Sequence, residues 1–149
     1  MAAGLYPQRV LDHQRHPHHR GALLRCTHAA DGTNPLCGDR LRVELCVEHG
    51  RIAAFGHVGE ACAVAIATAS MLGDLVTGAD VAAVDALHAR FAAFVAGTGD
   101  AEGLGELAAL EPLRRHAARR KCALLAWAAL RAALAGEPCA TTERGSTNG

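Results

Sequence analysis

The spacing of apolar residues changes at Cys62, and that change constrains the fold more than any other feature of the chain. In the stretch 40–47, Leu41, Val43, Leu45 and Val47 alternate with other residues, the period of a half-buried strand. After Cys62 the apolar residues are spaced for helices. Helices are predicted over 62–76, 80–96 and 116–135, with a shorter piece at 104–110.

Ahead of Cys62 the chain predicts one short helix and three strands. The helix covers 5–15, and the strands cover 24–30, 40–47 and 52–58, with turn residues at 31–35 and 48–51. Strands that precede a run of helices indicate an α+β fold, with a small antiparallel sheet of about three strands packed against a set of helices. We expect one domain over 1–135 and a disordered, polar tail over 136–149.

Composition narrows the class of protein. Lys and Arg together number 15, as do Asp and Glu, so the formal net charge is zero. A nucleic-acid binder needs a basic surface, and no apolar run here is long enough for a membrane span, so neither nucleic acid nor membrane is an expected partner. The first residues lack the pattern of a signal peptide, which favours the cytoplasm, where thiols stay reduced. Six cysteines there predict metal ligands, nucleophiles or buried thiols rather than disulfides.

The stretch 34–39, Asn-Pro-Leu-Cys-Gly-Asp, carries the strongest chemical signal. It places Cys37 and Asp39 two residues apart on a tight turn, and Cys62 and Cys122 follow downstream near predicted helix starts. Amide groups at a helix start favour the thiolate form. Three thiolates and one carboxylate form a complete Zn²⁺ ligand set, and three thiolates can also hold an iron–sulfur cluster. The spacing alone equally fits three unrelated buried cysteines, because no Cys-x-x-Cys pair occurs.

The remaining candidates carry no motif. Cys26, Cys46 and Cys139 have no partner at ligand spacing. The histidines 16, 18 and 19 could bind a metal adventitiously, although such clusters are usually solvated loops. His13 fits either a position close behind the site or a helix surface.

Four segments together resemble the IscU/NifU N-terminal superfamily over 6–135. The stretch 34–39 matches its NPxCGD motif in full. Residues 11–21 resemble its DHY-x-NP-x-N-x-G opening, with Gln14 and His16 as departures, and 59–71 resemble GxGCxxSxASxSM, with Ala61 in place of Gly. Residues 119–127 resemble ARxKCxxLxW.

Two features resemble the SufU branch in particular. Lys121 stands where IscU-type scaffolds carry a His, and the interval from Cys62 to Cys122 is longer than theirs. The resemblance implies an IscU/SufU-like fold and a zinc-dependent sulfurtransferase that accepts persulfide sulfur from a PLP-dependent, SufS-type cysteine desulfurase and passes it to downstream iron–sulfur assembly proteins. It implies Cys37, Asp39, Cys62 and Cys122 as Zn²⁺ ligands and Cys37 as sulfur acceptor. The alternative is an iron–sulfur cluster assembly scaffold.

Overall fold

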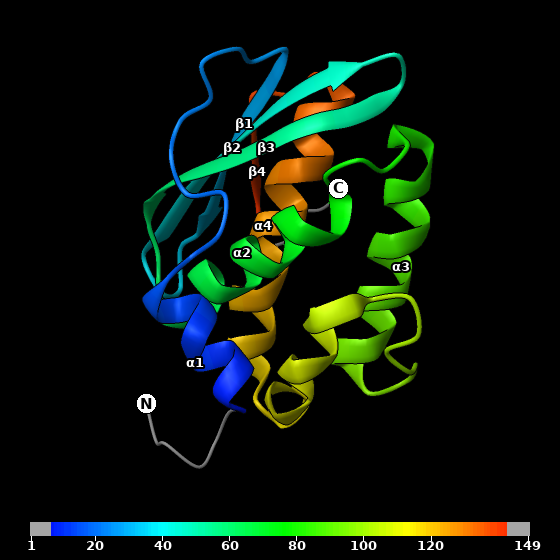
Figure 1. Cartoon of the computed structure of the whole chain (residues 1–149). Helices are drawn as coiled ribbons and strands as arrows, with labels where there is room; N and C mark the ends of the chain where they lie inside the picture. Colours follow the sequence, from blue (N-terminus) through cyan, green and yellow to red (C-terminus); the bar gives the residue numbers. More distant parts are fainter. Residues whose placement is uncertain (1–6, 143–149) are drawn as a thin grey trace.

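The protein has an α+β fold in which one layer of helices covers one face of a small sheet (Figure 1). The computed structural model describes residues 7–142. The elements are α1 Gln8–Arg15, β1 His28–Asn34, β2 Asp39–Glu48, β3 Arg51–Glu60, α2 Ala63–Val76, η1 Val81–Ala83, α3 Val84–Ala96, η2 Gly105–Arg115, α4 Ala117–Ala135 and β4 Cys139–Thr141, where η marks a 3₁₀ helix. The predicted fold class is confirmed.

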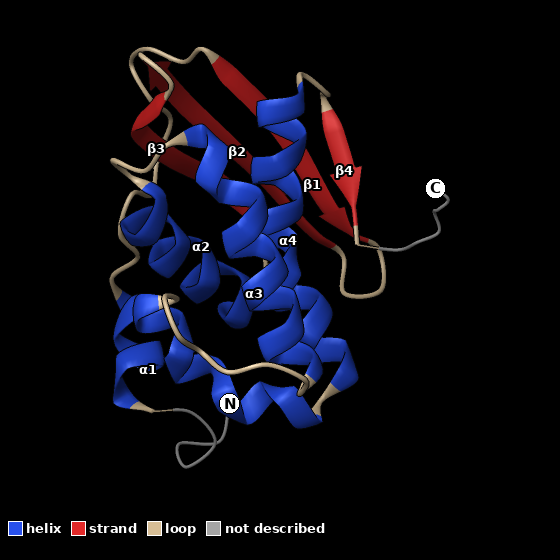
Figure 2. Cartoon of the chain, turned by 90° about the vertical axis from the view of Figure 1, so that its right-hand side faces the viewer, coloured by secondary structure: helices blue, strands red, loops and turns tan. Residues whose placement is uncertain are grey.

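The sheet has the strand order β3-β2-β1-β4. The first three strands are antiparallel, as predicted, and β4 adds a short parallel strand at the edge beside β1, visible in Figure 2. The prediction of a tail from 136 was therefore wrong for 139–141. A backbone bond from Asp31 N–H to the Pro138 carbonyl begins the pairing, because α4 ends directly beside β1. The remainder of that predicted tail, 143–149, lies outside the described residues.

The first strand starts and ends later than predicted. Residues 31–34 were expected to form a turn, but they pair with β2 as far as Asn34 and Asp39. Gly32 is needed there for packing: a Cβ at this position would lie 3.1 Å from Leu125 Cδ1 and 3.2 Å from Ala129 Cβ. A glycine that reads as a turn signal in the sequence therefore lets α4 approach the sheet closely.

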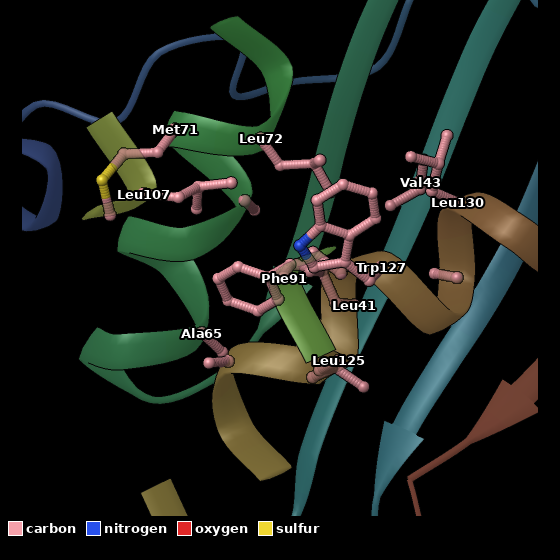
Figure 3. Packing of buried hydrophobic residues seen from close by; sticks show 14 of the residues in the cluster. Leu41, Val43, Ala65, Met71, Leu72, Phe91, Leu107, Leu125, Trp127 and Leu130 are labelled. Carbon is pink, nitrogen blue, oxygen red and sulfur yellow. The ribbon is translucent and has the colours of Figure 1, made fainter. Parts of the chain in front are cut away.

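The core lies between the sheet and the helices. Trp127 of α4 is fully buried and stacks on Phe91 of α3, with ring centroids 5.6 Å apart (Figure 3). Leu41 and Val43 of β2 face the same core. No helix within 7–142 is long and apolar enough to cross a membrane.

The segment 16–27 crosses the opposite face of the sheet. Arg20 forms a bridge with His57 of β3, the Leu23 amide donates to the Glu44 carboxylate of β2, and the Thr27 amide donates to the Leu45 carbonyl. The Leu23 amide and the Arg42 guanidinium both lower the pKa of Glu44. The segment thus connects α1 to β1 while covering polar side chains of the middle strand.

Candidate metal centre

A tight turn between β1 and β2 presents Cys37 to solvent. The Cys37 amide donates to the Asn34 carbonyl over 3.1 Å, and Gly38 has a φ of 72°, a conformation that glycine adopts without strain. Asp39 follows as the first residue of β2 and is buried, at 5% exposed. The thiol and the carboxylate of this turn therefore differ in access: Cys37 can meet a partner, and Asp39 cannot.

Cys62 sits directly before α2, at the end of β3. Gly59 makes that junction possible with a φ of +144°, where a Cβ would lie within 2.3 Å of the Arg40 carbonyl oxygen. The Cys62 amide donates to Asp39 Oδ1 over 2.9 Å. One oxygen of the Asp39 carboxylate thus ties the start of α2 to the start of β2.

Cys122 completes the cluster from the buried side, on the first turns of α4. Its Sγ lies 3.7 Å from Cys37 Sγ, and the Asn34 side-chain amide donates to it, also over 3.7 Å. Ligand atoms of Cys37, Asp39 and Cys122 all lie within 4.8 Å of one another. Cys62 is not in this group of three, although its thiol interacts with the Cys122 thiol.

The two inner thiols differ in their readiness to ionise. A hydrogen bond from Cys122 lowers the pKa of Cys62 to about 7, against the opposing effect of burial, and the Ala65 amide of α2 helps. The same hydrogen bond and burial raise the pKa of Cys122. Of the two thiols, Cys62 is therefore the one that ionises first.

The residues present fit a metal ion of the zinc class. Asp39 Oδ2 is buried and has no hydrogen-bond partner within 7–142. A buried carboxylate oxygen without a partner is unfavourable unless a cation or a donor meets it. Because the sulfurs of Cys37 and Cys122 converge with a carboxylate oxygen of Asp39, the donor set is of the sulfur and oxygen type that Zn²⁺ accepts.

The structure shows contacts around the cysteines that the sequence motif did not predict. The buried Asn34 amide next to Cys122 was part of the motif, but its contact with a residue 88 positions away carried no sequence signal. Cys26 and Cys139 are exposed. Cys46 is buried, and its thiol donates a hydrogen bond to the Glu48 carboxylate. None of the three is close to the thiol cluster.

Thiols and a carboxylate gathered where a three-stranded meander meets two helices define a class of small α+β domains with a candidate metal-ligand set. Comparison with known proteins places the chain within it: it belongs to the NifU-like N-terminal domain family, whose model matches residues 5–138. Its relatives include a zinc-dependent sulfurtransferase and iron–sulfur cluster assembly scaffold proteins.

The similar proteins include both a sulfurtransferase and a scaffold protein. The zinc-dependent sulfurtransferase SufU of Bacillus subtilis is 32% identical over 135 residues, covering 89% of this chain and 91% of its own. The iron–sulfur cluster assembly scaffold protein IscU of Streptococcus pyogenes is 33% identical over 132 residues, covering 87% and 82%. The crystal structure of a NifU-like N-terminal protein from Brucella abortus aligns with a TM-score of 0.82 at 25% identity, covering 89% of this chain and 93% of that one.

Proposed function

We propose that this protein is a zinc-dependent sulfurtransferase of iron–sulfur cluster assembly, acting in the cytoplasm with a SufS-type cysteine desulfurase and with downstream assembly proteins. The observation that carries the proposal is the position of Cys37. Its thiol is exposed on a turn, yet its sulfur lies 3.7 Å from the buried sulfur of Cys122. A sulfur acceptor needs such a thiol, reachable by another protein's active site and held at an anionic, metal-ligating cluster.

The roles of the four residues follow from their burial. The buried Asp39 and Cys122 and the half-buried Cys62 would hold the ion, and the exposed Cys37 would complete the set from the solvent side. Bound Zn²⁺ would supply positive charge that keeps the thiols deprotonated at neutral pH. The hydrogen bond from the Cys62 amide to Asp39 keeps the inner ligands in place independently of Cys37.

The transfer itself is a thiol–disulfide exchange. The Cys37 thiolate attacks the terminal sulfur of the desulfurase persulfide and forms a new sulfur–sulfur bond. The sulfur–sulfur bond of the donor breaks, and its electron pair leaves on the donor cysteine as thiolate. The same exchange in the other direction hands the sulfur from Cys37 to a downstream thiol, so no external oxidant or reductant is needed.

A cluster assembly scaffold is the second candidate. It is favoured by the identity with an IscU scaffold protein, which equals that with SufU to within one percentage point, and by three thiols that could equally ligate iron. Metal and acid-labile sulfide analysis of protein purified without oxygen separates the two: zinc without sulfide supports the transferase, and stoichiometric iron and sulfide support the scaffold.

Persulfide mapping tests the transferase directly. After incubation with a cysteine desulfurase and cysteine, mass spectrometry of the parent should show one added sulfur on the peptide carrying Cys37, and Cys37→Ser should show none. Cys139→Ser is the matched control, because it removes another exposed thiol, and it should accept sulfur like the parent. Sulfur that maps to Cys26 or Cys139, or that persists in Cys37→Ser, contradicts the proposal.

A further inference from the structure

A second group of metal-ligating side chains lies on the other side of α2, away from the cysteines. His13, His18 and Asp74 each bring a ligand atom within 4.8 Å of the other two. They come from α1, from the segment after it and from the end of α2, so folding and not sequence proximity assembles them. None of the three belongs to the thiol cluster.

His13 is held from both sides. It is 4% exposed; one ring nitrogen lies 2.5 Å from Ser70 Oγ and the other 2.5 Å from Glu106 Oε1 of η2. The His18 amide donates to the same Ser70 oxygen over 2.6 Å. A histidine whose second nitrogen is fixed by a carboxylate is the usual arrangement around protein-bound zinc, because it sets both the tautomer and the orientation of the ring.

Asp74 gathers the other two histidines. Its two oxygens lie 2.7 Å from His18 Nδ1 and 2.8 Å from His19 Nε2. Burial raises the pKa of Asp74, but the hydrogen bonds to His18 and His19 outweigh that effect. The pKa of Asp74 is lowered overall, so the carboxylate stays ionised. Gly73 makes room for this approach, because a Cβ there would lie 2.6 Å from His19 Cδ2. Asp74 is thus an anion with two imidazoles already at hydrogen-bonding distance.

An ion can reach the group from solvent. A cavity of about 850 Å³ is lined by His13, His18 and Glu106, with His16 and Asp12 also on its wall. His18 and Asp74 are themselves partly exposed, at 53% and 38% of their side chains. Because His13 lines an open cavity, and His18 and Asp74 are exposed to solvent, a small hydrated cation can reach the group.

We propose that His13, His18 and Asp74 form a second site for a divalent transition-metal ion of the zinc class, separate from the thiol cluster. Two imidazoles and one carboxylate are ligands that suit Zn²⁺ and leave a position for water. Because its donors are nitrogen and oxygen alone, this site differs in chemistry from the sulfur-rich centre. The proposal does not depend on the sulfur-transfer function, since the two sites share no residue.

Stepwise loading with Co²⁺ as a substitute for Zn²⁺ distinguishes the sites. Thiolate ligands give intense charge-transfer absorption that nitrogen and oxygen ligands lack. In the full chain we expect two Co²⁺ ions to bind, and only one of them to produce that absorption. The other should shift the imidazole proton resonances of His13 and His18 in NMR spectra, a readout of the parent protein that needs no variant.

Variants then assign the ligands. His18→Gln and Asp74→Asn change partly exposed side chains and should each weaken the nitrogen-and-oxygen site by more than about tenfold, with the charge-transfer absorption unchanged. His49→Gln and Asp80→Asn, which change residues outside the cavity, are controls and should bind both ions like the parent. A single ion per chain, unshifted His13 and His18 resonances, or a second ion that survives in His18→Gln and Asp74→Asn overturns the proposal.

Discussion

At the scale of single residues, Asp39 has two separable roles. Its Oδ1 accepts the Cys62 amide, and its Oδ2 is buried without a hydrogen-bond partner within 7–142. One oxygen therefore positions a helix, and the other is available for a cation. A substitution that keeps an acceptor but removes the charge should separate the two roles.

We expect Asp39→Asn to lose metal while keeping the fold. The amide carbonyl can still accept the Cys62 N–H, but a neutral amide is a poor replacement for a carboxylate ligand. Zinc affinity should fall by more than the roughly 10- to 100-fold that loss of an outer-shell partner costs. Competition with a coloured chelator measures the affinity, and the melting temperature of the metal-free protein checks the fold.

Asp31→Asn is the control for that change, because Asp31 is a partly buried carboxylate of the neighbouring strand and lies 3.8 Å from Arg42. Its zinc affinity should equal that of the parent. Equal affinities in Asp39→Asn and the parent would remove Asp39 from the ligand set.

The sequence predicted the local part of the site but not the contacts between segments far apart in the chain. The turn and its Cys37–Asp39 pair were predicted from local residues, because a proline, a glycine and two ligands lie within six positions. The burial of Asn34 against Cys122, and of His13 between Ser70 and Glu106, depends on contacts 57 to 93 positions apart. Local composition gives no signal for such contacts.

At the scale of elements, local patterns worked where one face of the element is buried. The strand β2 and helices α2 and α4 start and end within a residue or two of their predicted bounds, because their apolar residues keep one period. The strand β4 is three residues long and half exposed, and only the exit of α4 beside β1 decides that it pairs. The 3₁₀ helix η2 continues past Pro112, where a stop was predicted.

His57 connects the segment 16–27 to β3. Its Nε2 donates to the His18 carbonyl over 3.0 Å, and its buried Nδ1 has no partner within 7–142, so the neutral ring fits and a second N–H would be unsatisfied. Burial accordingly lowers the pKa of His57 below 6.5.

The lowered pKa of His57 predicts a loss of stability in acid. Below pH 6.5 the imidazole of His57 binds a proton in the unfolded chain but not in the folded chain. The free energy of unfolding therefore decreases as the pH falls below 6.5, and above that pH His57 causes no such loss. His57→Gln should reduce this slope by up to about 1.4 kcal/mol per pH unit. Urea unfolding at a series of pH values gives both slopes.

The lowered pKa of His88 also makes stability decline in acid, and it does so equally in the parent and in His57→Gln. The difference between their slopes therefore reports His57 alone. His49→Gln, an exposed histidine of the β2–β3 turn, should leave the slope of the parent unchanged. Parallel slopes for the parent and His57→Gln would show that His57 does not control acid stability.

At the scale of the whole molecule, the thiol cluster joins three parts of the chain. Cys37 and Asp39 come from the β1–β2 turn, Cys62 from the junction of β3 with α2, and Cys122 from α4. A bound ion therefore connects the sheet to two helices, and its binding free energy adds to the free energy of unfolding.

Removal of zinc should lower the melting temperature without unfolding the protein at room temperature. Most residues of the core around Trp127 lie outside the thiol cluster, so the loss should be several kcal/mol, below the roughly 10–16 kcal/mol apparent for zinc-finger peptides that cannot fold without metal. Calorimetry before and after chelation measures it. Asp39→Asn should show no further decrease on chelation, and an unchanged melting temperature in the parent would argue against this connection.

The wide separation of these ligands along the chain also has a temporal consequence. Cys122 is synthesised 122 − 62 = 60 residues after Cys62. At about 5–20 residues per second, a growing polypeptide carries Cys37, Asp39 and Cys62 for roughly 3–12 s before the ribosome adds the last thiol. During that interval the nascent protein has an incomplete ligand set that ions can leave readily. With the ligand set proposed above, secure metal loading would therefore follow translation of α4.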